Sequence, residues 1–415
     1  MELVKINERI FREYDIRGIY GEDLSSDVAY TLGRSYGTFM KRYQQDTVIV
    51  GHDNRTSSPI LNEAFIQGVN DSGSNVIDLG LVTTPMFYFA RKYFQIPTGV
   101  MITASHNPSE YNGFKTSFEP IGNAYGELIK EFGIFTNEHK FDTGEGTKKT
   151  FNIHDEYLKL INNSISLGTW KPKVVVDLGN GTASVIVKDA LEMLGLEYVI
   201  LNEKKDLSQR TEYLDPSIKD KMVELSNKVK ELGYDIGIGL DGDADRIGIV
   251  ASNGYILGAE EYMIIMYRYL NNKLKNRKAL FDVKCGYSLI DELKKLDILP
   301  VMNRTGNSYQ NKAMQEGDFD FGGEYSGHVF FRDKWIGSDD GLYGGLRMIE
   351  VMSNTNKPLT ELLEGIEKVY GSPEIKVKVT DENKFDIVNK VKEEALNKGY
   401  KIIDIDGVRI ELENT

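Results

Sequence analysis

One local pattern occurs three times in this chain and constrains its fold more than any other feature of the sequence. A short run rich in β-branched residues is followed by a small polar loop and then by a helix-like pattern, at residues 48–59, 174–184 and 279–288. The spacing is roughly a hundred residues, the size of one domain. Repetition at this spacing predicts several similar α/β domains rather than a solenoid.

The length of 415 residues predicts two to four domains, because one hydrophobic core seldom grows so large. A polar stretch near residue 140, a turn at 252–254 and a Gly-Ser-Pro hinge at 371–373 suggest the boundaries. We therefore expect domains at residues 1–150, 151–255, 256–370 and 371–415.

The last of these domains is expected to be α+β. Residues 375–379 alternate like a strand, residues 384–398 read as a helix, and two strand-like runs follow at 400–405 and 408–412. Because the sequence stops directly after a strand, we expect this fourth domain to be incomplete.

Composition narrows the class of partner and the compartment. A net charge of −13 argues against nucleic-acid and anionic-membrane partners, which select positive surfaces. The single cysteine, Cys285, allows no intrachain disulfide, and the first twelve residues lack the apolar block of a signal peptide. No apolar run approaches the ~20 residues that cross a bilayer. These features predict a cytoplasmic protein.

The strongest chemical signal is an acidic triplet directly after a strand-like apolar run. Asp241, Asp243 and Asp245 stand at alternate positions, where their carboxylates repel one another unless a cation lies between them. An EF-hand is excluded because Arg246 replaces the required glycine and Ser252 the required glutamate. Hard oxygen ligands without cysteine or histidine predict a magnesium site. Arg246 adds a cation that can bind phosphate in a bidentate manner.

A second candidate is the loop at residues 103–108, where small neighbours leave Ser105 accessible as a nucleophile. Lys115 brings a cation nearby. Because adjacent side chains on a strand-like turn tend to point to opposite sides, we expect that His106 does not act as the base for Ser105.

A third candidate is the glycine-rich segment at residues 322–328. Glu324 and Ser326 offer hydrogen-bond acceptors suited to sugar hydroxyls, and His328 can exchange a proton near neutral pH.

Two nucleotide-binding interpretations are weaker. The segment 179–184 follows a strand, with Glu203 about twenty residues on, as in a dinucleotide fingerprint. However, Ser184 stands where the third glycine belongs, and the acidic triplet has no role in hydride transfer. The Walker-type pattern of a P-loop nucleotidase does not occur anywhere in the sequence.

The three candidate segments, together with residues 11–18 (Phe-Arg-Glu-Tyr-Asp-Ile-Arg-Gly), stand in an order that resembles the α-D-phosphohexomutase superfamily, closest to its bacterial phosphomannomutase/phosphoglucomutase branch. The resemblance runs from residue 11 to the end of the chain. It implies three similar mixed α/β domains and an incomplete fourth α+β domain around a central cleft, with the fourth domain closing over substrate.

The resemblance also implies the activity. Ser105 would carry a phosphoryl group that moves between the 1- and 6-positions of mannose or glucose, through a hexose 1,6-bisphosphate that also serves as activator. Mg²⁺ would be held by Ser105, Asp241, Asp243 and Asp245. His328 and Lys115 are the candidate bases, and Arg246 assists catalysis. The implied substrate-binding residues are Tyr14, Arg17, Lys284, Asn307, Glu324, Ser326 and His328. The expected partners are small phosphosugars, and the expected state is a monomer or weak dimer.

The sequence departs from the family pattern at two places. Asn307 stands in a loop where the family often has histidine, and the sequence ends before the Arg/Ser/Thr-rich phosphate loop of the family's fourth domain. Two alternatives therefore stay open: a phosphoglucosamine mutase, and a truncated sugar-phosphate-binding protein without activity. Tyr325, with an apolar run after the third motif, favours neutral hexoses over glucosamine.

Overall fold

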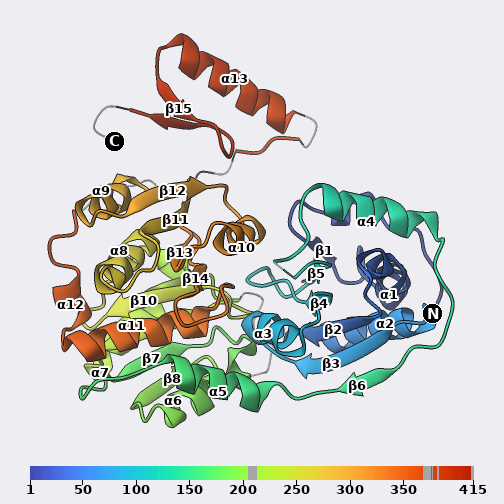
Figure 1. The fold of residues 1–415 in the computed structure, drawn as a ribbon, viewed down its shortest axis with the longest axis horizontal. Helices are drawn as coiled ribbons and strands as arrows, with labels where there is room; N and C mark the ends of the chain where they lie inside the picture. Colours follow the sequence, from blue (N-terminus) through green and yellow to red (C-terminus); the bar gives the residue numbers. More distant parts are fainter. Residues whose placement is uncertain (121, 204–212, 368–374, 376, 381–382, 413–415) are drawn as a thin grey trace.

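The fold is described from a computed structural model that covers residues 1–120, 122–203, 213–367, 375, 377–380 and 383–412. One half of the molecule is built on the first sheet, the other half on two further sheets, and a small C-terminal unit lies over the second half (Figure 1). None of the helices in the described part of the chain is both long and apolar enough to span a bilayer.

The first sheet has six strands in the order β1-β5-β4-β2-β3-β6. β2, β3, β4 and β6 are parallel, and β5 and β1 add antiparallel pairs at one edge. The strands are β1 (Ile16–Ile19), β2 (Thr47–His52), β3 (Asn75–Leu81), β4 (Gly99–Ile102), β5 (Tyr111–Ser117) and β6 (Lys148–Thr150).

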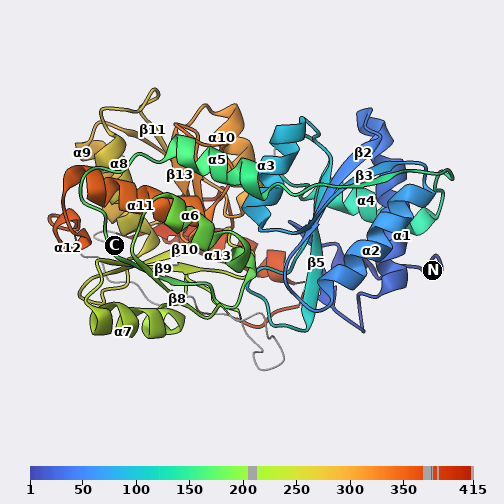
Figure 2. The same ribbon diagram turned by 90° about the horizontal axis from the view of Figure 1, so that it is seen from below.

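Helices cover this sheet on both faces (Figure 2). They are α1 (Ser26–Phe39), α2 (Ser58–Asp71), α3 (Thr84–Phe94) and α4 (Glu127–Glu138), with short 3₁₀ turns at Glu8–Ile10 and Met40–Tyr43. Thr83 caps the start of α3, since its hydroxyl accepts from the Met86 amide, and Pro85 fits the first turn. α1 and α2 pack backbone to backbone because Gly33 and Gly68 leave no side chain between them.

The second and third sheets share one topology. Their orders are β10-β9-β7-β8 and β12-β11-β13-β14, parallel except for the last strand to join, which is antiparallel. The same core occurs in the first sheet as β3-β2-β4-β5. The strands are β7 (Val174–Asp177), β8 (Tyr198–Leu201), β9 (Ile236–Leu240), β10 (Ile247–Ala251), β11 (Lys278–Asp282), β12 (Leu299–Asn303), β13 (Phe321–Gly323) and β14 (Val329–Phe331).

The repeated pattern in the sequence marks the first strand of each shared core, namely β2, β7 and β11. This strand lies between two parallel neighbours and is buried almost throughout, so it is rich in β-branched residues. The prediction of three similar mixed α/β domains is confirmed. The predicted turn at 252–254 is also present.

The helices of this half are α5 (His154–Ser164), α6 (Val187–Met193), α7 (Val223–Leu232), α8 (Ala259–Leu270), α9 (Tyr287–Lys295), α10 (Asn307–Glu316), α11 (Gly341–Thr355) and α12 (Leu359–Leu362), with 3₁₀ turns at Thr182–Val185 and Lys219–Met222. α11 lies between two sheets. A side chain at Gly344 would meet Val329 of β14, and one at Gly345 would meet Ile238 of β9. One continuous core joins residues of all three sheets.

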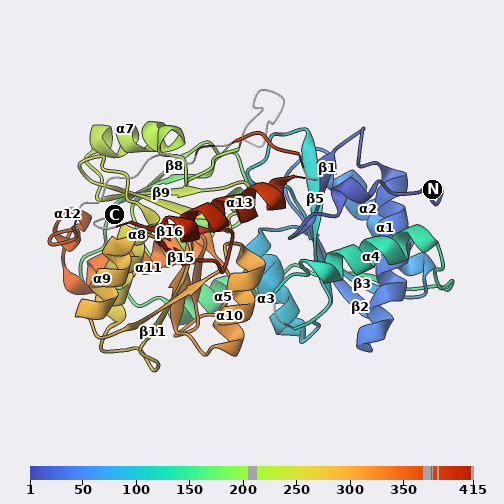
Figure 3. The same ribbon diagram turned by 90° about the horizontal axis from the view of Figure 1, so that it is seen from above.

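The C-terminal unit consists of α13 (Lys384–Asn397) and the hairpin β15 (Lys401–Ile403) and β16 (Arg409–Glu411), as the sequence predicts (Figure 3). The strand expected at 375–379 is wrong for its described residues, which form no strand, since their apolar side chains are exposed and no sheet edge pairs with them. The hinge expected at 371–373 lies outside the described residues.

Candidate active site

The three sequence motifs occupy equivalent places in the three shared cores. Each lies in the loop that joins the third strand of the core to the antiparallel fourth: β4 to β5, β9 to β10, and β13 to β14. The last two loops are joined directly, since Arg246 and His328 form a β-bridge and the Ile247 amide donates to the Gly327 carbonyl over 3.0 Å.

Ser105 meets the acidic triplet across the boundary between the first and second sheets. Its hydroxyl donates to Asp241 Oδ2 over 2.7 Å, and it is only 6% exposed. The residue has a φ of 50°, in the left-handed region that few side chains adopt. Its amide donates to Thr103 Oγ1, and the guanidinium of Arg55 binds its carbonyl oxygen. This support fixes the hydroxyl against the second sheet.

The expectation that His106 points away from Ser105 is wrong, while its role as a base stays untested. Its Nδ1 lies 3.2 Å from the Ser105 hydroxyl, because the left-handed turn at Ser105 breaks the alternation of a strand. Burial, followed by the nearby Arg246, lowers the pKa of His106 to about 3. The imidazole beside the serine is therefore neutral.

The acidic cluster is buried and partly neutralised by one lysine. Asp241, Asp243 and Asp245 are at most 1% exposed, with ligand oxygens within 4.8 Å of one another. Lys115 donates to Asp243 Oδ2 over 2.7 Å and to Asp245 Oδ2 over 2.6 Å. Thr84, the first residue of α3, also donates to Asp243 Oδ2 over 2.7 Å.

Charge in this cluster is left incompletely balanced. Burial, and then the charges of Asp245 and Asp243, raise the pKa of Asp241 well above its ordinary value. Burial opposes ionisation of Asp243 and Asp245 too, but the Lys115 ammonium lowers the pKa of both carboxyls. Asp243 Oδ1 is buried without a hydrogen-bond partner in the described structure. An orphaned carboxylate oxygen among hard donors fits a divalent cation.

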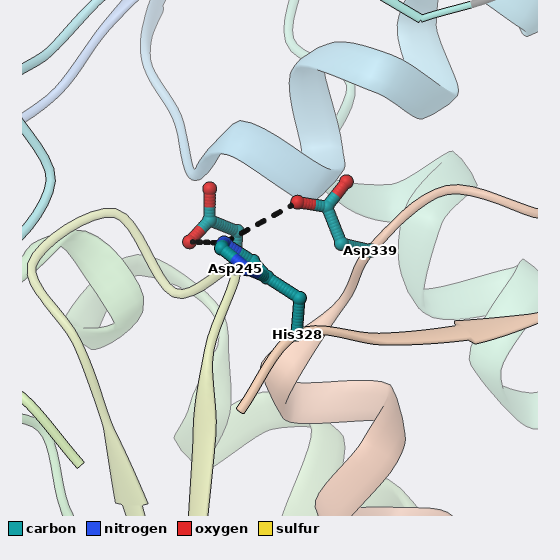
Figure 4. Close-up of side chains that lie close together, drawn as sticks. All are labelled: Asp245, His328 and Asp339. Atoms are coloured by element: carbon teal, nitrogen blue, oxygen red, sulfur yellow. Dashed lines mark ion pairs between the residues drawn. The ribbon is translucent and has the colours of Figure 1, made fainter. Parts of the chain in front are cut away.

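His328 lies between Asp245 and Asp339 (Figure 4), and Glu324 is a third carboxylate in contact with its ring. Its Nδ1 is 2.8 Å from Glu324 Oε2, while its Nε2 is 3.2 Å from Asp245 Oδ1 and 3.7 Å from Asp339 Oδ2. Burial alone would lower the pKa of His328, but Asp245 and Glu324 raise it to about 10. In this arrangement the ring is an imidazolium that carries a proton toward the acidic cluster.

Two arginines flank the cluster. Arg246 Nε lies 3.4 Å from His328 Nε2, and its amide donates to Asp241 Oδ1 over 3.1 Å. Arg17 is nearly buried and donates to the Ala104 carbonyl over 2.7 Å while pairing with Asp15. Both therefore lie beside loops that carry Ser105 or the triplet.

The remaining predicted residues surround the loop after β12. Tyr14 donates to the Thr305 carbonyl over 3.1 Å, and the Gly306 amide donates to Glu324 Oε1 over 2.6 Å. Asn307 donates to Asp339 Oδ2 over 3.1 Å. Two further residues lie near this loop: Ser326 Oγ is 3.0 Å from His328 Nδ1, and Lys284 is exposed in the loop after β11.

The C-terminal hairpin also reaches this loop. Asp406 accepts from the Thr305 amide over 3.0 Å, and Arg409 donates to the carbonyls of Val283 and Cys285. The fourth unit thus contacts the loops after β11 and β12.

Sequence reasoning missed two buried charged residues of the site. Arg55 donates to the carbonyls of Ser105, Asn107, Pro108 and Tyr111, and so shapes the whole serine loop. Arg55 lies inside the first repeated segment, and its position there was the only sequence feature that could have identified it. Asp339 joins α10 to His328 and stands beside Asp340 in a loop, where no pattern identifies it.

Comparison with known proteins places these features in a family. The sequence matches the descriptions "Phosphoglucomutase/phosphomannomutase, alpha/beta/alpha domain I" over residues 8–130, domain II over 155–254 and domain III over 259–370. It is 37% identical to a phosphomannomutase/phosphoglucomutase of Pseudomonas syringae, covering 97% of this chain and 86% of that protein. It is 33% identical to a phosphoglucomutase of Neisseria gonorrhoeae, covering 99% and 89%.

A solved structure agrees. A phosphoglucomutase/phosphomannomutase family protein of Burkholderia thailandensis superposes with a TM-score of 0.90 at 32% identity, covering 98% of this chain and 89% of that one.

Proposed function

We propose, from the premise that this chain belongs to the phosphoglucomutase/phosphomannomutase family, that it interconverts hexose 1-phosphate and hexose 6-phosphate through a phosphoserine at Ser105. The observation that carries the proposal is the 2.7 Å contact of the Ser105 hydroxyl with Asp241, which joins a nucleophile and an acidic cluster in one buried site. The substrates are glucose and mannose phosphates, the sugars named in the relatives.

The residues that would hold Mg²⁺ are Asp241, Asp243, Asp245 and the Ser105 oxygen. The orphaned Asp243 Oδ1 and the all-oxygen donor set support this assignment. When bound, the ion would neutralise phosphate charge as a Lewis acid.

The protein's own groups supply the rest. A sugar hydroxyl attacks the phosphorus of phosphoserine, the bond from phosphorus to Ser105 Oγ breaks, and the hydroxyl proton passes to a base. His328 Nε2, which faces the cluster, is the atom we assign to proton exchange: the imidazolium gives its proton to the departing Ser105 oxygen, and the ring then takes up the proton of the attacking hydroxyl. Lys115 and Arg246 balance the charge on the transferring group. Glu324 and Ser326 hold the sugar hydroxyls.

The bisphosphate then turns within the cleft and returns one phosphoryl group to Ser105. The boundaries at residues 150, 255 and 370 remain our proposal for the domains that open and close around it. These boundaries fall between the separate sheets, which supports them, although α11 packs against both the second and the third sheet. Cys285 is buried and forms no disulfide, which supports the proposal of a cytoplasmic enzyme. We also propose that the protein is a monomer or a weak dimer.

The experiment is intact-mass analysis of the purified chain together with a coupled mutase assay. The chain should carry a phosphate-sized increment that Ser105→Ala removes, and the same variant should lose mutase turnover while keeping its melting temperature. Full turnover by Ser105→Ala would refute the assignment of Ser105 as the nucleophile.

A further inference from the structure

A cavity lies outside the active site, between α3 of the first sheet and α10 of the third. Its volume is about 390 Å³, within the range of small-molecule sites. α3 and α10 lie on the two sides of the junction between the halves of the molecule (Figures 1 and 2). The lining residues are Tyr88, Arg91, Lys92, Gln95, Ile96, Pro97, Pro120, Gly122, Asn311, Gln315, Ile336 and Ser338.

The charge of this cavity is opposite to that of the protein. The chain has a net charge of −13, yet the described lining holds two basic side chains and no acidic one. A neighbouring cavity of about 690 Å³ is different, since Glu13, Glu119, Glu127 and Glu316 offset its three basic residues. The cavity between α3 and α10 therefore has uncompensated positive charge.

Neither cation is neutralised locally. Arg91 is buried and donates only to the carbonyls of Pro97, Glu119 and Gly122 among described residues. Lys92 stands at the rim, with no hydrogen-bond or ion-pair partner in the part of the chain that the structure describes. Burial, and then the charge of Arg332, lower the pKa of Lys92, as expected for an ammonium without a counter-charge.

Hydrogen-bond donors lie on the opposite wall. Ser338 Oγ is buried and has no partner within the described residues. The amides of Asn311 and Gln315 also line the cavity and donate to Asp339 Oδ1 and the Ile336 carbonyl. Ile96, Pro97, Pro120 and Ile336 supply apolar wall. A cation and a free hydroxyl across an apolar cavity are the elements that recognise a phosphate group on a small body.

We propose that this cavity is a second ligand site, which binds a small phosphorylated metabolite between Lys92 of α3 and Ser338 before α11. This site is separate from the acidic cluster, and we propose that it binds its ligand without converting it.

The position of the site connects it to the active site through two rigid elements. α3 begins at Thr84, which binds Asp243, and its last turns line the cavity. α10 carries Asn311 on the cavity wall, and Asn311 holds Asp339, which faces His328. A ligand that contacts both α3 and α10 would therefore affect the distance between the acidic cluster and His328.

The test is protection of Lys92 from acylation, with inorganic phosphate as the probe. The wild-type chain is treated with an amine acylating reagent at increasing phosphate, with potassium chloride at matched ionic strength as reference, and each lysine is quantified by peptide mass spectrometry. At ten times the dissociation constant, Lys92 should react about tenfold more slowly. The exposed Lys140 should react at an unchanged rate.

Two variants make the test specific. Ser338→Ala should raise the phosphate concentration for half-protection by about two- to tenfold, the factor for one lost hydrogen bond. Arg246→Ala weakens phosphate binding at the active site and should leave protection of Lys92 unchanged. Equal acylation of Lys92 in phosphate and chloride would overturn the proposal, as would protection that disappears in Arg246→Ala or persists fully in Ser338→Ala. Because acylation is read at one lysine, the result is independent of mutase activity.

Discussion

Lys115 provides the most direct test of how the acidic cluster is stabilised. Its ammonium binds Asp243 at 2.7 Å and Asp245 at 2.6 Å, with all three side chains at least nine-tenths buried. Lys115→Met keeps the length of the side chain but removes the charge. Removing one partner of a buried ion pair costs about 3–5 kcal/mol, because the remaining charge is left uncompensated.

That cost converts to a measurable shift. At about 2–4 °C per kcal/mol, metal-free Lys115→Met should melt about 6–20 °C below the wild type at pH 7.5 in EDTA. Millimolar Mg²⁺ should then raise the melting temperature of the variant more than that of the wild type, because the cation replaces the missing charge.

The pH dependence follows from the same contacts. Lys115 lowers the pKa of Asp243 and Asp245, so its stabilisation is present above the ordinary carboxyl pKa and is lost as the pH falls through the lowered values. The difference between variant and wild type should therefore shrink in acid.

Thermal unfolding followed by fluorescence, with and without Mg²⁺, measures these effects. Lys130→Met is the matched control: its pair with Glu127 is exposed, so its melting temperature should hardly move. If Lys115→Met melts with the wild type in EDTA and gains nothing extra from Mg²⁺, the cluster does not depend on this charge and the reasoning fails.

Three further predictions concern neighbouring features. Gly242→Ala places a Cβ 2.3 Å from the Ser105 carbonyl oxygen, so it should cost about 1–3 kcal/mol and lower kcat in the mutase assay. Gly258→Ala should do neither, because its Cβ would lie 3.6 Å from the flexible carboxylate of Glu261. His328 has a pKa raised to about 10 from an ordinary 6.5, so its stabilisation is complete below pH 6.5 and is lost as the pH rises toward 10; in EDTA, His328→Gln should flatten that decline in melting temperature, and an unchanged slope would contradict it. In a panel of glucose, mannose and glucosamine 1-phosphates, kcat/KM should be higher for the two neutral hexoses, and a preference for glucosamine would favour the alternative mutase.

The architecture could be predicted from the sequence because the first strand of each shared core has a recognisable residue pattern. β2, β7 and β11 are buried between neighbours, so hydrophobic β-branched runs ending in polar loops had to appear at similar spacing. The acidic triplet could be recognised in the sequence because carboxylates at alternate positions repel one another unless a counter-charge lies between them. By contrast, residues 375–379 have the alternation of a strand, but the described residues among them (375 and 377–379) pair with no sheet edge, and alternation alone does not supply one.

Long-range contacts were beyond local patterns. The roles of Arg55 and Asp339 depend on carbonyls and amides that come together only when the sheets assemble. The contact of His106 with Ser105 depends on one left-handed residue, and non-glycine residues in that region are too uncommon to predict from type.

The proposed nucleophile, the acidic cluster and the proposed sugar-binding loop lie on three copies of one core, which has a consequence for how such a protein changes. Each copy contributes a single short hairpin, so under the proposed roles residues 324–327 could be exchanged to alter sugar preference while Ser105 and the acidic triplet keep their own scaffolds. The β-bridge between Arg246 and His328 sets the limit of that freedom: a transplanted hairpin must preserve its backbone path and retain the imidazole of His328.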